Sequence, residues 1–255
     1  MRALKDTWTM TKRSLRHTVR SMDTIITVAA TPIAMMLLFV FVFGGSFGSM
    51  FAHGPVKYID FIVPGIVAMT VASGIAYAAL RVNMDLQKGI INRFRTMPVA
   101  PSSILGGHAV SSVLSNLFSV LLVLLVALLA GFRPHADVVE WLVFGGLVTL
   151  FTAATTWMAI MFGLLAKTAE GSGSFAYLLL LLVFVSSAFT PTSGMSAPVR
   201  AFAEHQPMTP IVETMRSLLT NGTVGSDLWP AVAWCVGLLA VSYVLALRIY
   251  KKKAI

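Results

Sequence analysis

The chain reads Asp85-Leu86-Gln87-Lys88-Gly89-Ile90-Ile91-Asn92-Arg93-Phe94-Arg95-Thr96-Met97-Pro98 between two long apolar runs, Tyr58–Leu80 and Ile104–Phe132. No other stretch between the two terminal segments combines so much charge with interrupted hydrophobicity. Unpaired backbone groups and basic side chains are costly in hydrocarbon, so this segment must lie in water at one face of a membrane. We call residues Asp85–Pro98 the charged island.

Composition places the chain among integral membrane proteins. Hydrophobic residues make up 57% of its 255 residues, charged residues only 11%, and the mean hydropathy is +0.83. A soluble domain carries about 25% charged residues, so soluble, disordered and fibrous classes are disfavoured. The length suits one membrane domain over residues 1–255. The net charge of +9 sits in loops, where membrane orientation explains it better than a nucleic-acid partner.

The apolar runs predict an all-α integral membrane protein with six transmembrane helices. A helix needs roughly 20 residues to cross about 30 Å of hydrocarbon. The runs are continuous rather than alternating, which argues against a membrane β-barrel. The six predicted spans are Thr24–Phe43, Tyr58–Leu80, Ile104–Phe132, Val138–Ala166, Ser174–Thr190 and Leu228–Leu247.

Basic residues predict the orientation of these spans. With the N-terminus inside, all but four of the 19 Lys and Arg residues fall on the inner side. The four exceptions are Lys57, Arg133, Arg200 and Arg216. Because positive charge accumulates in cytoplasmic loops, we expect both termini to be cytoplasmic.

Two further segments are predicted to be helical without crossing the membrane. Residues 1–22 place apolar side chains on one face and cations beside them, as in an amphipathic helix lying along the inner interface. Residues 193–227 read as an outer re-entrant hairpin of two helices, Ala197–Glu204 and Thr209–Thr220. Glu213 and Arg216 are three residues apart there and are expected to pair.

The sequence offers little for catalysis or metal binding. No G-x-x-x-x-G-K-[ST] motif is present to cradle a nucleotide. The run Gly44–Gly48 matches G-x-S-x-G, but it ends a predicted membrane helix and lacks the strand-to-helix context of a hydrolase. His53, His135 and His205 come singly from loops without the spacing of zinc ligands. We therefore expect no catalytic residue, no metal and no cofactor on this chain.

Ionisable residues are almost absent from the middle of the predicted spans. Asp60, Asp137 and Glu140 each lie within the first turn of a span, where they reach the headgroups. This argues against an ion-coupled carrier, which needs carboxylates or broken helices at the midplane.

Hydroxyl side chains are the remaining polar groups within the spans, and they have two interpretations. They line a path for an amphiphilic substrate, or they bond to their own helix backbone, which is the commoner case. The candidate path residues are Thr70, Ser73, Thr155, Thr156, Ser186, Ser187 and Thr190, with Thr152 as a further hydroxyl of the same kind.

The charged island has the features of a docking helix. Residues 85–94 suffice for two to three turns, and Met97-Pro98 ends them. Ile90 and Phe94 contribute to an apolar ridge with charges on its flanks, which suits burial and register at an interface. The alternative is a plain solvated loop that follows the positive-inside rule.

Three groups of residues together resemble the permeases of type-2 ABC transporters, most closely the daunorubicin-resistance exporter subfamily. The first is Gly89-x-x-x-Arg93-Phe94-Arg95-x-Met97-Pro98, with Asp85 before it and Gly106-Gly107 after it. The others are Tyr58-x-x-Phe61-x-x-Pro64-Gly65 and Pro207-x-x-Pro210 followed by Arg216 and Gly222. One position departs, because His108 stands where the family often has a basic residue.

The resemblance implies a function. The loop over residues 81–101 would be the coupling helix, fitting a groove on a separate ATPase subunit that binds ATP and magnesium. Two permeases and two ATPases would export hydrophobic drugs, antibiotics or lipids across a bacterial plasma membrane. The implied coupling residues are Asp85, Lys88, Gly89, Ile90, Arg93, Phe94, Arg95, Met97 and Pro98. The alternative from another class is an intramembrane enzyme or a non-transporting scaffold.

Overall fold

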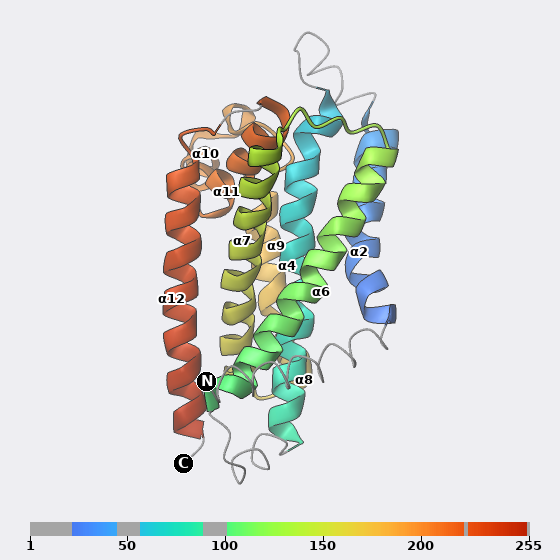
Figure 1. The fold of residues 1–255 in the computed structure, drawn as a ribbon. Coiled ribbons are helices and arrows are strands. Elements are labelled where there is room, and N and C mark those ends of the chain that lie inside the picture. The colour runs from blue at the N-terminus through green and yellow to red at the C-terminus, as the bar shows by residue number, and fades with distance from the viewer. Residues whose placement is uncertain (1–21, 45–56, 89–100, 222–223, 254–255) are drawn as a thin grey trace.

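The computed structural model describes residues 22–44, 57–88, 101–221 and 224–253, and within these ranges every regular element is a helix (Figure 1). The prediction of an all-α protein is therefore confirmed for the described residues. The elements are α2 (Met22–Leu37), η1 (Leu38–Val42), α4 (Tyr58–Gln87), α6 (Pro101–Leu129), α7 (Val138–Leu165), α8 (Ala169–Gly173), α9 (Phe175–Phe184), η2 (Thr192–Gly194), α10 (Ala197–His205), α11 (Met208–Arg216), η3 (Ser217–Asn221) and α12 (Leu228–Lys253).

Four long helices are apolar and long enough to cross a membrane: α4, α6, α7 and α12. They contain 30, 29, 28 and 26 residues, which at about 1.5 Å per residue exceeds the roughly 30 Å of hydrocarbon. α7 begins at a capping box in which Asp137 and Glu140 each satisfy the backbone of the other. Four of the six predicted spans thus correspond to full-length helices.

The other two predicted spans are shorter apolar helices, Val28–Val42 and Ala169–Phe184. α9 ends at Phe184, six residues before the predicted boundary at Thr190. The Ser186 hydroxyl donates to the Val183 carbonyl at 2.6 Å and accepts from the Ala188 amide at 3.2 Å. Such side-chain bonds compete with the helical pattern, and the chain turns there instead. The predicted end of this span was wrong, and the total of six spans stays a prediction.

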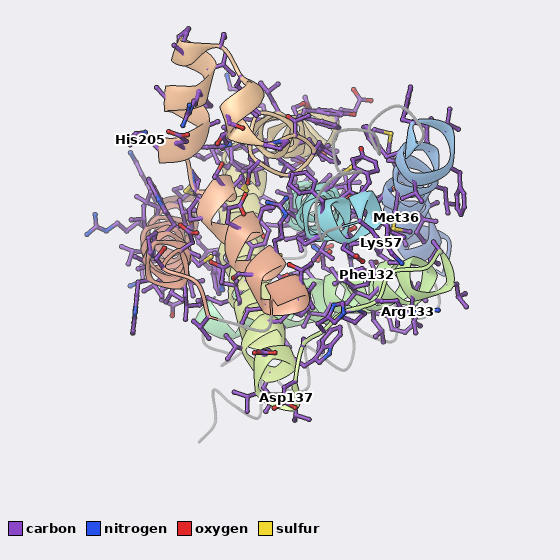
Figure 2. The ribbon with its side chains drawn as sticks, turned by 90° about the horizontal axis from the view of Figure 1, so that it is seen from above. Met36, Lys57, Phe132, Arg133, Asp137 and His205 are labelled. Atoms are coloured by element: carbon purple, nitrogen blue, oxygen red, sulfur yellow. The ribbon has the colours of Figure 1, made fainter. Side chains whose placement is uncertain are left out.

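α4 lies at the centre of the bundle. It packs against α2, α6, α7, α8, α9 and α11, and Figure 2, which looks down the bundle, shows it (cyan) between α2 (blue) and α7 (yellow-green). Every residue from Tyr58 to Ala72 is buried. A helix that is apolar on all sides is expected in such a central position.

Two glycines bring backbones into close contact with α4. A Cβ on Gly65 would lie 2.5 Å from the Ala188 carbonyl oxygen. A Cβ on Gly163, in α7, would lie 2.6 Å from the Ala79 carbonyl oxygen. Only glycine fits at these two positions without moving a backbone.

The bundle has two distinct ends. At the hairpin end, α10, α11 and η3 lie beside the starts of α4 and α12 (Figure 1). At the island end, α4 ends, α6 begins and α12 ends. α10 and α11 with η3 match the two predicted hairpin helices, and α11 is buried over most of its length. Insertion of this hairpin into a leaflet stays a prediction, and the amphipathic helix over 1–22 lies almost wholly outside the described residues.

Gly163→Ala is expected to destabilise the bundle, because the new Cβ would meet the α4 backbone. Overpacking of this kind costs about 1–3 kcal/mol. Gly146→Ala is a matched control in the same helix, since a Cβ there meets no atom within 4 Å. Thermal unfolding of the purified chain in detergent should show a lower Tm for G163A only. Equal Tm values for the two variants would contradict the close α4–α7 contact.

Candidate functional site

Only the base of the predicted coupling loop is described. Asp85 lies in the last turn of α4, and Lys88 ends that helix by donating its amide to the Met84 carbonyl at 2.9 Å. α4 therefore runs two turns beyond the predicted end of the span at Leu80. The other predicted coupling residues lie outside the described residues and stay predictions: Gly89, Ile90, Arg93, Phe94, Arg95, Met97 and Pro98.

A side-chain contact joins α4 and α6 at the two ends of the predicted coupling loop. His108 Nε2 on α6 lies 3.2 Å from the Asp85 carboxylate on α4. Both side chains are only partly exposed. His108 is the position at which the sequence departs from the family pattern, and here it connects the end of α4 to the start of α6.

Asn83 attaches α4 to the end of α7. It is fully buried, and its Nδ2 donates to the carbonyls of Gly163 at 2.9 Å and Ala166 at 2.8 Å. Gln87 donates in turn to Asn83 Oδ1 at 2.8 Å. The last carbonyls of a helix have no partner within it, so Asn83 acts as a cap supplied by a neighbouring helix. Sequence reasoning missed this contact, because Asn83 follows the predicted end of the span at Leu80 and its partners lie 80 or more residues away in the sequence.

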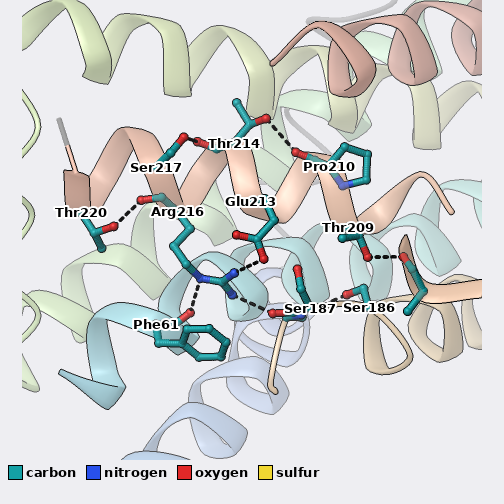
Figure 3. A network of polar contacts seen from close by, with 12 residues as sticks. Phe61, Ser186, Ser187, Thr209, Pro210, Glu213, Thr214, Arg216, Ser217 and Thr220 are labelled. Atoms are coloured by element: carbon teal, nitrogen blue, oxygen red, sulfur yellow. Dashed lines mark hydrogen bonds and ion pairs between the residues drawn. The ribbon is translucent and has the colours of Figure 1, made fainter. Parts of the chain in front are cut away.

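At the hairpin end of the bundle, Arg216 attaches α11 to α4 and to the backbone after α9 (Figure 3). It is 8% exposed, and it donates from Nε to the Phe61 carbonyl at 3.2 Å and from Nη2 to the Ser187 carbonyl at 2.7 Å. Its Nη1 donates to the Glu213 carboxylate, and the guanidinium lies over the Phe61 ring, 3.9 Å from the centroid. The predicted Glu213–Arg216 pair is confirmed, whereas the contacts to α4 and Ser187 were not predicted.

The hairpin supplies partners for the last turn of α9 and for the irregular backbone that follows it. Besides Arg216, Gln206 donates from Nε2 to the Leu182 carbonyl at 2.8 Å. Thr209 donates to the Ala203 carbonyl and links α11 to α10. Non-helical backbone at membrane depth is tolerated where protein groups satisfy it. The hairpin and the end of α9 therefore form one connected unit.

Four of the seven candidate path hydroxyls bond to backbone carbonyls close by in the sequence. Thr70, Ser73, Thr155 and Ser186 donate to backbone carbonyls three or four residues earlier, at 2.6–3.0 Å. Thr156 and Ser187 are buried, and Thr190 is exposed. Ser187 Oγ has no hydrogen-bond partner among the described residues. These positions lie on α4, on α7 and after α9, and a shared path stays a prediction.

The described residues bring no metal-binding set together. They contain no group of three or more His, Cys, Asp or Glu side chains positioned to share an ion. His205 Nδ1 lies 2.8 Å from the Ala201 carbonyl of its own helix. His53 and Gly45–Gly48 of the G-x-S-x-G match lie outside the described residues.

An exposed ion pair on α10 contrasts with the buried one on α11. Arg200 donates from Nε to Glu204 Oε1 at 2.7 Å, and both side chains are exposed. The hydrogen bond from Arg200 lowers the pKa of the Glu204 carboxyl. In the turn before α12, burial and the charge of Glu213 raise the pKa of the Asp227 carboxyl.

A family comparison and a search for related proteins both find membrane proteins of ABC transporters. Residues 5–220 match the family described as ABC-2 type transporter. A daunorubicin resistance ABC transporter permease protein of Streptomyces coeruleorubidus is 28% identical over 233 residues, which cover 90% of this chain and 80% of that protein. A probable doxorubicin resistance ABC transporter permease protein of Mycobacterium tuberculosis is 22% identical over 231 residues, covering 91% and 83%.

Arg216→Met is expected to destabilise the hairpin end, because it leaves the buried Ser187 carbonyl without the Arg216 donor. An unsatisfied buried group costs about 1–3 kcal/mol. Arg200→Met is the matched control, since an exposed ion pair is worth only about 0–1 kcal/mol. The fraction of monodisperse protein that survives heating, read by size-exclusion chromatography, should fall for R216M only. If R200M lost as much, the buried contacts of Arg216 would not be the cause.

Proposed function

The chain belongs to the ABC-2 type transporter family and is a membrane permease subunit of an ABC exporter; we propose that it moves hydrophobic drugs, antibiotics or lipid-like molecules outward across a bacterial plasma membrane. The family match over residues 5–220 carries this conclusion. The substrate class is supported by the two relatives, whose names refer to daunorubicin and doxorubicin resistance. No observation favours an intramembrane enzyme or a scaffold.

The energy source in this proposal is a separate ATPase subunit. ATP and magnesium would bind to two copies of that subunit, and a second permease copy, identical or related, would complete the exporter. The sequence supports this division, because it contains no G-x-x-x-x-G-K-[ST] motif of its own. This chain would act as a single membrane domain and carry out no covalent chemistry.

Coupling would enter through the loop over residues 81–101. The support lies at the base of this loop, where Asp85 and His108 join α4 to α6. α4 then runs without interruption for 30 residues, with Asn83 attaching it to α7 and Arg216 attaching it to the hairpin. A push on the loop would thus shift α4, α7 and the hairpin together. The candidate path hydroxyls would contact substrate during this movement.

Reconstitution with the ATPase tests the proposed function. The chain should co-purify with an ABC ATPase and stimulate its hydrolysis, and inside-out vesicles holding both should accumulate daunorubicin when ATP is added. Drug accumulation by vesicles that contain this chain alone would contradict the proposal.

Phe94→Ala should uncouple ATP hydrolysis by the ATPase subunit from drug transport by this chain, because Phe94 is the aromatic residue of the proposed docking ridge. Truncating a central aromatic anchor typically costs about 2 kcal/mol or more of binding free energy. The affinity for the ATPase should therefore fall by about tenfold or more, and drug uptake per ATP should fall with it. The double change Arg93→Glu and Arg95→Glu should weaken co-purification of the chain with the ATPase, because it reverses two charges of the proposed docking segment. Lys251→Glu with Lys252→Glu is the matched control, since these exposed lysines end α12 at the same end of the bundle. Unchanged coupling in F94A would remove Phe94 from the mechanism.

Cysteine labelling tests the proposed orientation, in which both termini are cytoplasmic. The single native cysteine, Cys235, is fully buried, so new cysteines can be read separately. Ser196→Cys, at the hairpin end, should react with a membrane-impermeant maleimide in intact cells. Lys252→Cys should react only after lysis. The reverse pattern would show that the bundle is inserted the other way up.

A further inference from the structure

Three phenylalanine rings stack on one another where η1 meets the end of α9 and the backbone that follows it. The centroids of the Phe39 ring, in η1, and the Phe189 ring lie 5.3 Å apart, with 24° between the ring planes. The centroids of Phe189 and of Phe184, the last residue of α9, lie 4.9 Å apart, with 20° between the planes. We call Phe39, Phe184 and Phe189 the phenylalanine stack, in which Phe189 is the ring that the other two share.

The backbone between Phe184 and Phe189 is fixed by hydrogen bonds. The Ser186 hydroxyl bonds to backbone groups on both sides of it in the sequence, and Arg216 of the hairpin donates to the carbonyl of the next residue. The stack therefore lies at the hairpin end of the bundle. Because the backbone is already ordered, a ligand that contacts these rings has little conformational entropy to remove.

The stack is closed at Phe189 and open at Phe184. Phe189 is 7% exposed and Phe39 is partly buried, whereas Phe184 is 41% exposed. Since the Phe189 ring covers one side of the Phe184 ring, the exposed area belongs to the rest of that side chain. A further ring can add to the stack there.

The open ring stands at the end of an exposed apolar face of α9. Tyr177, Leu181 and Phe184 are all exposed, and their spacing of four and three residues places them on one side of the helix. In a membrane such a face borders the acyl chains. An apolar molecule dissolved in the bilayer therefore reaches Phe184 without crossing the protein interior.

Aromatic rings can select a ligand from among lipids, whereas aliphatic side chains cannot. Lipid tails are as apolar as leucine, so an apolar drug gains little over an acyl chain by packing against Leu181. Two aromatic rings gain free energy from offset stacking in addition to the area that they bury. An acyl chain lacks this geometry, so the open ring of Phe184 favours flat aromatic molecules.

We infer that the open side of Phe184 binds planar fused-ring aromatic molecules, which extend the phenylalanine stack by one ring system. The inference rests on the proposed function and deepens it, because it names one contact of the substrate and the shape that this contact selects. Daunorubicin, the probe of the export assay, has such a planar core. In the proposed orientation the hairpin end is the outer end, so the site holds the drug shortly before its release.

Competition on the unaltered chain tests the selection of shape. The purified full chain in phospholipid nanodiscs should bind daunorubicin, read from the drug's own fluorescence with empty nanodiscs as the blank. Anthracene is planar and aromatic, and perhydroanthracene is its saturated, non-planar counterpart. Anthracene should displace the drug at about fivefold lower concentration in the lipid, a ratio within the range expected for one stacked ring pair.

Substitutions assign the selection to the ring. Phe184→Leu should abolish the preference for anthracene, because leucine keeps an apolar side chain without a ring. Phe184→Trp should retain the preference. Phe202→Leu is the matched control, since Phe202 is a phenylalanine of comparable exposure on α10, outside the stack. Size-exclusion profiles check that each variant folds.

Three results would overturn the inference. Equal displacement by the two hydrocarbons on the unaltered chain would show that ring shape is not selected. An unchanged preference in F184L would place the aromatic contact elsewhere. Disulfide formation between two Phe184→Cys chains in the membrane, undiminished by daunorubicin, would assign the exposed ring to a contact between two copies of the chain.

Export separates this inference from the proposed function. With the ATPase present, vesicles that hold F184L and accumulate daunorubicin as fast as the unaltered chain would remove Phe184 from the path, and the proposed function would stand. An unaltered chain that selects anthracene but exports no drug with the ATPase would contradict the proposed function, and the binding site would stand.

Discussion

Buried peptide groups need partners from the protein itself wherever lipid surrounds it, because hydrocarbon offers no hydrogen bonds. The long helices meet this requirement along their length, but their ends and interruptions do not. In this chain, side chains of other elements complete the pairing. Asn83 satisfies carbonyls at the end of α7, while Gln206 and Arg216 satisfy carbonyls at and after the end of α9. The arrangement of the bundle depends on these few polar side chains.

The same side chains attach α4 to its neighbours at both ends, and the proposed coupling depends on these attachments. α4 is attached to α7 near one end and to the hairpin near the other, and its close contact with Gly163 leaves no side-chain layer between the two backbones. A central helix fixed in this way passes on a displacement instead of absorbing it. The proposed coupling loop continues directly from this helix.

Hydropathy and charge predicted much of the fold, because α4, α6, α7 and α12 are long apolar runs, although α4 continues to Gln87, beyond the predicted end at Leu80. The early end of α9 was not predictable in this way, since hydropathy measures side chains and not backbone pairing. The pair Glu213–Arg216 followed from helical spacing, but the bonds from Arg216 to Phe61 and Ser187 join residues far apart in sequence. Asn116 and Gly74 likewise become partners only through the packing of α6 on α4.

The position of Gly163 also bears on how the bundle responds to its bilayer. Where two helices touch through main-chain atoms, neither can tilt alone when the surrounding lipid thickens or thins. α4 and α7 would then lean as a pair, and the adjustment to mismatch would fall on the helices that surround them. Membrane thickness would consequently act on this protein through its periphery, and its centre would keep a constant geometry in membranes of different lipid composition.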